Sequence, residues 1–152
     1  MRQVEFSRRE FFALGAGAAT VAILGGVNGA RAATATEDAI NAFTGGAAPA
    51  EGKVELGAPE IAENGNTVPI EISVESPMTD DDYVESVLIL ADGNPNPGVA
   101  TFHFTPMSGE AVASTRIRLA STQNVVAVAK MKDGSFFMAK REVKVTIGGC
   151  GG

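Results

Sequence analysis

The sequence of 152 residues contains one cysteine, Cys150, one histidine, His103, and no tryptophan. A single cysteine excludes an internal disulfide bond, and one cysteine with one histidine cannot supply the four ligands of a structural zinc site. A nucleophilic pair would require His103 beside Cys150. A lone histidine rarely makes a site, so we expect His103 on the outer face of a strand, opposite the face that Phe102 and Phe104 share. Residues 80–82 are three aspartates without the spaced oxygens of a calcium loop, so they predict an acidic turn. The sequence shows no assembled catalytic site.

Long apolar runs are also scarce. The best candidate, residues 11–27, is diluted by glycine, whereas a membrane-spanning helix needs about 20 strongly apolar residues. It follows the pair Arg8 and Arg9 and ends at an Ala-Arg-Ala site, residues 30–32. This order predicts a signal peptide over residues 1–32, and the arginine pair indicates the twin-arginine route. We expect export to the periplasm, with no stable membrane insertion after cleavage.

An excess of basic residues is likewise missing. The net charge of the whole chain is −6, and removing residues 1–32 takes away four basic and two acidic residues, which leaves −8. An acidic domain without clusters of basic and aromatic residues is poorly suited to nucleic acid or anionic membranes. The 120 residues that remain suffice for one compact domain.

The first part of the mature chain predicts a short helix. Thr34 and Glu37 have the spacing of a capping box, and Ala39, Ile40 and Phe43 could form one apolar face. The glycines at positions 45 and 46 should end this helix, and residues 45–52 have the composition of a linker.

Beyond the linker the apolar pattern has a period of two, as in strands. Ile70, Ile72 and Val74 alternate with polar residues, and residues 87–90 are a continuous apolar run typical of an inner strand. Residues 92–98 have loop chemistry, and Asp-Gly at 133–134 predicts a two-residue type I′ hairpin. About seven short strands at this spacing predict an immunoglobulin-like antiparallel β-sandwich over residues 33–147. The Cys…Trp…Cys core of antibody domains is absent, so the likeness is architectural.

The end of the chain sets its only cysteine among glycines. The last strand is expected over residues 136–147, with Val143, Val145 and Ile147 facing inward. The residues after it predict a flexible arm, which comprises Gly148, Gly149, Cys150, Gly151 and Gly152. A thiol on a thin arm could enter clefts that exclude bulkier peptides. No neighbouring cation activates it, so we expect the enzymes that it visits to do so.

Several segments resemble the SoxY family, the sulfur-carrier subunits of the periplasmic thiosulfate-oxidising (Sox) system. The most specific is VKVTIGGCGG at 143–152. PEIAENG at 59–65, SPMT at 76–79, NPNPGVA at 94–100 and TQNV at 122–125 support it, as does the twin-arginine signal. The likeness covers nearly all of the mature chain.

The resemblance implies a carrier rather than an enzyme, without a cofactor of its own. It implies a heterodimer with a SoxZ-like sandwich subunit and covalent attachment of sulfur to Cys150. A c-type cytochrome enzyme would couple thiosulfate to this cysteine as an S-thiosulfonate, and a manganese hydrolase would release sulfate. Where the pathway contains one, a sulfane dehydrogenase would oxidise the remaining sulfur.

Two other interpretations remain open at this point. Ubiquitin-like carriers also end in Gly-Gly and bear sulfur on the terminal carboxyl group, here that of Gly152, but they need cytoplasmic activation. A periplasmic interaction module could instead dimerise through an intermolecular disulfide of Cys150.

Overall fold

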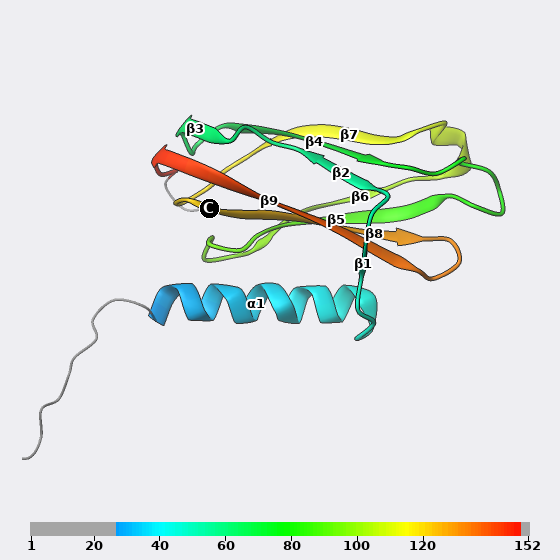
Figure 1. Ribbon diagram of the computed structural model, residues 1–152, viewed down its shortest axis with the longest axis horizontal. Coiled ribbons are helices and arrows are strands. Elements are labelled where there is room, and N and C mark those ends of the chain that lie inside the picture. The colour runs from blue at the N-terminus through cyan, green and yellow to red at the C-terminus, as the bar shows by residue number, and fades with distance from the viewer. Residues whose placement is uncertain (1–26, 150–152) are drawn as a thin grey trace, which may run out of the picture.

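The computed structural model describes residues 27–149, with side chains from residue 34 onward. It contains a helix and nine strands in two sheets, with the helix against the outer face of the larger sheet (Figure 1). The elements are α1 (Val27–Thr44), β1 (Ala50–Glu51), β2 (Val54–Gly57), β3 (Ile61–Asn64), β4 (Val68–Val74), β5 (Val84–Ala91), β6 (Gly98–His103), the 3-10 helix η1 (Pro106–Ser108), β7 (Ala111–Ile117), β8 (Gln123–Met131) and β9 (Phe136–Ile147).

The two sheets form the predicted sandwich. The larger one has the order β1-β9-β8-β5-β6, with β3 also paired to β9, and the smaller one has the order β2-β4-β7. All pairings are antiparallel except the short ones of β1 and β3 with β9, which are parallel. In β4 the apolar residues are buried and the intervening ones are more exposed, as their period of two predicts. The predicted fold class, mainly β with one helix, is confirmed.

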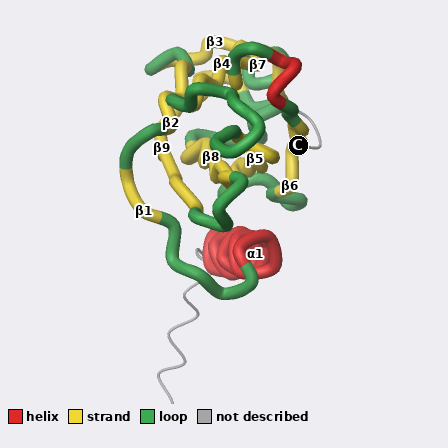
Figure 2. Tube along the Cα trace, turned by 90° about the vertical axis from the view of Figure 1, so that its right-hand side faces the viewer, coloured by secondary structure: helices red, strands yellow, loops and turns green. Residues whose placement is uncertain are grey.

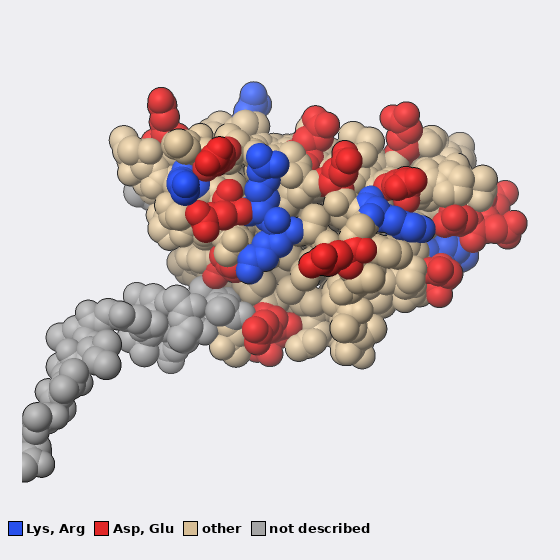
Figure 3. All heavy atoms as spheres, viewed as in Figure 1, with Lys and Arg blue, Asp and Glu red and all other residues tan. Residues whose placement is uncertain are grey.

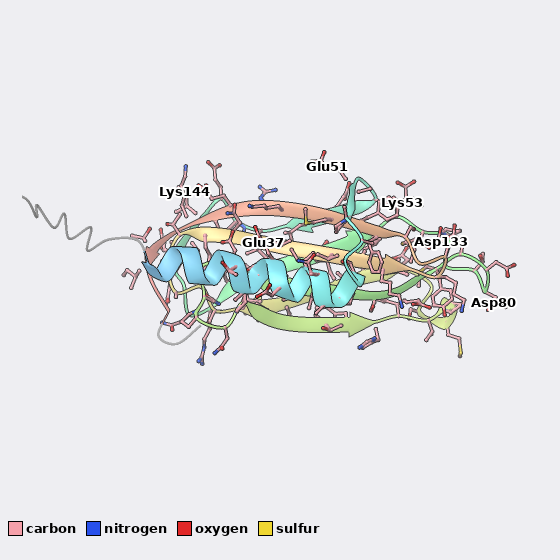
Figure 4. The ribbon with its side chains drawn as sticks, turned by 90° about the horizontal axis from the view of Figure 1, so that it is seen from below. Glu37, Glu51, Lys53, Asp80, Asp133 and Lys144 are labelled. Atoms are coloured by element: carbon pink, nitrogen blue, oxygen red, sulfur yellow. The ribbon has the colours of Figure 1, made fainter. Side chains whose placement is uncertain are left out.

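Two apolar clusters stabilise the domain. The main one fills the space between the sheets and includes Ile72, Ile89 and Leu119. The second lies between α1 and the larger sheet, where Ile40 and Phe43 pack on Leu90 and its neighbours in β8. Figures 2 and 4 show α1 lying against this sheet, roughly along the direction of its strands. Because both faces of β5 are covered, its apolar run is continuous rather than alternating.

The helix α1 ends as predicted but begins earlier. Gly45 and Gly46 follow it with φ values of 67° and 87°, which glycine adopts readily at a helix end. Its first residue is Val27, so Thr34 lies inside the helix and does not cap it. The four residues directly before Thr34, Ala-Arg-Ala-Ala, are strong helix formers, and no proline precedes them back to Val27, so the helix extends toward the N-terminus despite Gly29. Among the described residues, no helix has the length and apolar character that crossing a bilayer would require.

The β8–β9 hairpin differs from the predicted type I′ turn. Gly134 has a φ of 83°, but Asp133 does not have the positive φ that a type I′ turn requires. The Gly134 N–H donates to the Met131 carbonyl (3.0 Å) and the Met131 N–H donates to the Ser135 carbonyl (2.9 Å). This is a three-residue loop with glycine at the left-handed position. The Ser135 hydroxyl and N–H donate to the Asp133 carboxylate, which lowers the pKa of Asp133.

The predicted linker, residues 45–52, contains a short strand. Residues 50 and 51 form β1, which pairs in parallel with Phe137 and Met138 of β9. Backbone pairing at a sheet edge requires no apolar pattern, so the composition of the segment did not reveal it.

Charged side chains of opposite sign lie next to one another on the surface. On the face seen in Figure 3, basic side chains lie among acidic ones. Lys130 and Glu85 form an ion pair at 2.8 Å, and Lys140 and Asp92 approach to 3.9 Å.

Candidate functional site

The predicted attachment residue follows the described chain directly. Cys150, Gly151 and Gly152 lie outside the described residues, as do Arg8 and Arg9 of the signal motif. The structure does describe the residues up to Gly149, and these decide where Cys150 leaves the domain.

The last residue of β9 does not face the core. Ile147 is 66% exposed, so its predicted inward orientation is wrong. The β8–β9 ladder ends at the pair of Gln123 with Val143, and beyond it β9 pairs with β3 alone. The end of β9 is therefore outside the two-layered part of the sandwich, where alternation no longer predicts burial.

Three backbone segments meet just after this strand. The Gly149 N–H donates to the Leu119 carbonyl (2.9 Å), the Leu119 N–H donates to the Gly65 carbonyl (2.8 Å), and the Gly65 N–H donates to the Ile147 carbonyl (2.7 Å). We call this arrangement of Gly65, Leu119 and residues 147–149 the clasp. Gly149 is buried within it.

Glycine is required in the clasp because the backbones approach closely. A Cβ on Gly65 would collide with the Leu119 carbonyl oxygen, and one on Gly148 would collide with the Ala120 carbonyl oxygen. A Cβ on Gly149 would lie 2.8 Å from the Gly65 carbonyl oxygen. The sequence prediction places Gly148 and Gly149 in a free arm, whereas the structure gives both residues fixed neighbours.

A buried polar pair, Asn94 and Gln123, holds the loop that contains Leu119 of the clasp. The Asn94 side chain, 2% exposed, donates to the Arg118 carbonyl (2.8 Å) and accepts from the Ala120 N–H (3.0 Å). Gln123 donates to the Asn94 side-chain oxygen (2.8 Å) and accepts from the Gly93 N–H (2.7 Å). The bonds of Asn94 thus fix the peptide groups on both sides of Leu119.

Sequence reasoning did not identify Gly65, Asn94, Thr122 or Gln123 as residues of this site. The signal that could have found them is the set of segments that carry the family resemblance, at 59–65, 94–100 and 122–125. These segments are far apart in the sequence, but each contributes to this end of the sandwich. Thr122 does so by accepting a hydrogen bond from the Val145 N–H (2.9 Å).

His103 lies far from the clasp. It pairs with Ser86, which is opposite Lys130, seven residues along β8 from Gln123. At about 3.3 Å per residue this separates it from the clasp end by roughly 23 Å. His103 is exposed, as predicted, and the geometry offers no partnership with the chain end.

The acidic turn also lies at the opposite end. Figure 4 shows Asp80 at one end of the sandwich and Lys144, near the end of β9, at the other. The Asp82 N–H donates to the Thr79 hydroxyl (3.2 Å) and the Asp82 carbonyl accepts from the Thr79 N–H (2.9 Å), which makes a tight turn before β5. Within residues 27–149 no group of three or more acidic, histidine or cysteine side chains could hold a metal ion.

The Gly148→Ala substitution tests whether the clasp stabilises the domain. We expect Gly148→Ala to lower the free energy of unfolding by about 1–3 kcal/mol, because its Cβ would overlap a backbone oxygen. Gly151→Ala is the matched control and should change it by no more than about 0.5 kcal/mol. Denaturant unfolding of both variants measures the difference, and equal values would mean that the clasp contributes no stability.

Comparisons with known proteins agree with the fold. The family model described as sulfur oxidation protein SoxY matches residues 40–150. The solved structure of the sulfur carrier protein SoxY from Chlorobium limicola f thiosulfatophilum has a TM-score of 0.65 and 34% identity, and the match covers 78% of this chain and 97% of that one. A search of curated proteins gave no match.

Two more distant structures share the fold alone. A superoxide reductase from Ignicoccus hospitalis has a TM-score of 0.56 at 19% identity, with 63% of this chain and 82% of that chain covered. A putative superoxide reductase from Thermotoga maritima has a TM-score of 0.53 at 18% identity, with 60% and 84% covered. The family match spans both the body of the sandwich and its glycine-rich end, and the chain belongs to the SoxY family of sulfur oxidation proteins.

Proposed function

We propose that this protein is a covalent carrier of sulfur intermediates in thiosulfate oxidation, with Cys150 as the attachment residue. The observation that carries the proposal is that β9 and the clasp bring the chain to one end of the sandwich, immediately before Cys150. Family membership supports it, as does the similarity to the sulfur carrier protein SoxY from Chlorobium limicola f thiosulfatophilum. The domain is then a carrier on which partner enzymes act.

The loading step is an oxidation. The Cys150 thiol and a thiosulfate dianion lose two electrons and one proton as a sulfur–sulfur bond forms, which gives a cysteine S-thiosulfonate. The electrons go to a c-type cytochrome enzyme, which also activates the thiol. A manganese hydrolase then uses water to cleave off sulfate, and a persulfide stays on Cys150. Where the pathway contains a sulfane dehydrogenase, that enzyme oxidises the remaining sulfur.

The carrier works in the periplasm as a heterodimer with a SoxZ-like subunit. In this proposal Arg8 and Arg9 direct export of the folded pair, and cleavage follows Ala32. The residues of α1 that pack on the larger sheet, Ala39, Ile40 and Phe43, all follow this cleavage site. The mature chain therefore keeps the contacts that cover its second apolar cluster.

Intact-mass measurement of the mature heterodimer tests the function. After incubation with thiosulfate and the oxidising cytochrome partner, we expect the neutral mass of the protein to rise by that of two sulfur and three oxygen atoms, the S2O3 unit of one thiosulfate. The gain should map to the C-terminal peptide and be lost on reduction. Cys150→Ser is the control and should gain nothing.

Two results would contradict the proposal. Sulfur on the Gly152 carboxyl group would indicate a ubiquitin-like carrier. A disulfide-linked dimer that forms without any thiosulfate adduct would indicate an interaction module, and thiosulfate oxidation would then continue with Cys150→Ser.

A further inference from the structure

The clasp limits how far a cysteine directly after it can move. A tether that began after Ile147 would have two more residues, or about 7 Å more reach when fully extended. With Gly149 held by the Leu119 carbonyl, the next Cα is tied to within about 3.8 Å of the Gly149 Cα. The position of the clasp therefore determines where the thiol of Cys150 is presented.

The position of the clasp depends on the backbone of residues 118–120. Leu119 provides both of its backbone hydrogen bonds to the clasp, one to Gly65 and one to Gly149. Its side chain is fully buried in the main cluster, which fixes the residue from the inside. The N–H of Leu119 belongs to the peptide group between residues 118 and 119, and its carbonyl belongs to the one between residues 119 and 120. The orientation of these two peptide groups therefore sets the direction of both hydrogen bonds.

Asn94 holds both of those peptides with one side chain. Its amide nitrogen donates to the Arg118 carbonyl and its oxygen accepts from the Ala120 N–H. Gln123 in turn orients the Asn94 amide by donating to the same oxygen, at 2.8 Å. A buried network in which each member is satisfied permits little rotation of the loop. Asn94 is in the loop between β5 and β6, more than 50 residues before Cys150 in the sequence.

We propose that Asn94 is a positioning residue for the carrier cysteine: by fixing residues 118–120 it holds Gly149 and so sets the point at which Cys150 leaves the domain. The inference rests on the proposed carrier function. The segment that carries the thiol would then leave the domain at a fixed point beside the loops at 64–66 and 118–120. Partner enzymes would not meet a thiol on a free tether of five residues.

Two measurements on the mature protein test this role. Amide hydrogen exchange reports whether Gly149 is protected in the wild type, which requires no variant. A nitroxide spin label on Cys150, the only cysteine, reports the mobility of the next residue. The variants are Asn94→Ala and Val84→Ala. The control, Val84, is fully buried at the start of β5, opposite Met131 and remote from the clasp.

We expect a protected Gly149 amide in the wild type. Asn94→Ala should lower that protection at least about tenfold, because the loop loses two backbone-directed hydrogen bonds, and should sharpen the spectrum of the label. Val84→Ala should leave the label spectrum unchanged. Any loss of Gly149 protection in Val84→Ala should be no larger than the loss of global stability predicts. Denaturant unfolding of the same variant measures that global loss.

An unprotected Gly149 amide in the wild type would overturn the proposal, as would equal label mobility in Asn94→Ala and Val84→Ala. These results are independent of thiosulfate. If a thiosulfate adduct forms on Cys150 while Gly149 is unprotected, the carrier function stands and the positioning role falls. If Gly149 is protected and responds to Asn94→Ala but no adduct forms, the carrier function falls.

Discussion

Cys150→Ser should abolish sulfur loading and leave the stability of the domain unchanged. A serine hydroxyl cannot form the sulfur–sulfur bond on which the proposed cargo depends, so the loss should be complete rather than partial. The two clusters that stabilise the domain consist of residues that precede Gly148. The melting temperature should therefore stay within about 2 °C of the wild type, as for substitutions away from packed features.

Intact mass after thiosulfate exposure and thermal unfolding measure these two effects on the same samples. Gly151→Ala is the matched control, because it changes the same segment but keeps the thiol, and it should load. Loading that persists in Cys150→Ser would mean that sulfur is attached elsewhere. A large loss of stability would mean that the cysteine is packed into the domain.

The regular strands of the sandwich were predictable because their residues obey one local rule. In β4 every second side chain enters the core, so the spacing of Ile70, Ile72 and Val74 predicts the strand. At the end of β9 the same rule fails for Ile147, because burial there depends on whether a second layer is present opposite the strand. That condition belongs to the tertiary structure and leaves no period in the sequence.

The double role of glycine explains why the clasp was missed. Consecutive glycines such as Gly148 and Gly149 predict flexibility, but the same residue type also permits close approach of backbones. The two roles differ only in what lies opposite, here the carbonyl groups of Gly65 and Ala120. The contact is made by main-chain atoms of segments that are distant in sequence, so composition and spacing do not encode it.

Comparing Ile72, which is buried, with Ile147, which is exposed, tests which end of the sandwich belongs to the core. Ile72→Ala should lower the free energy of unfolding by about 2–5 kcal/mol, because Ile72 is 1% exposed between the sheets and the remaining cavity cannot collapse fully. Its neighbours across the smaller sheet, Leu56 in β2 and Ala113 in β7, hold it from both sides and restrict that collapse. Denaturant unfolding at equilibrium measures the loss.

Ile147→Ala is the matched control, since it makes the same chemical change at a position where alternation also predicts burial. With its side chain largely in solvent and only its backbone oxygen engaged in the clasp, the loss should be below about 1 kcal/mol. A loss as large as that of Ile72→Ala would mean that the Ile147 side chain faces the core, as the sequence pattern predicts. The end of β9 would then belong to the core, and the clasp would have to lie elsewhere than at Gly65 and Leu119.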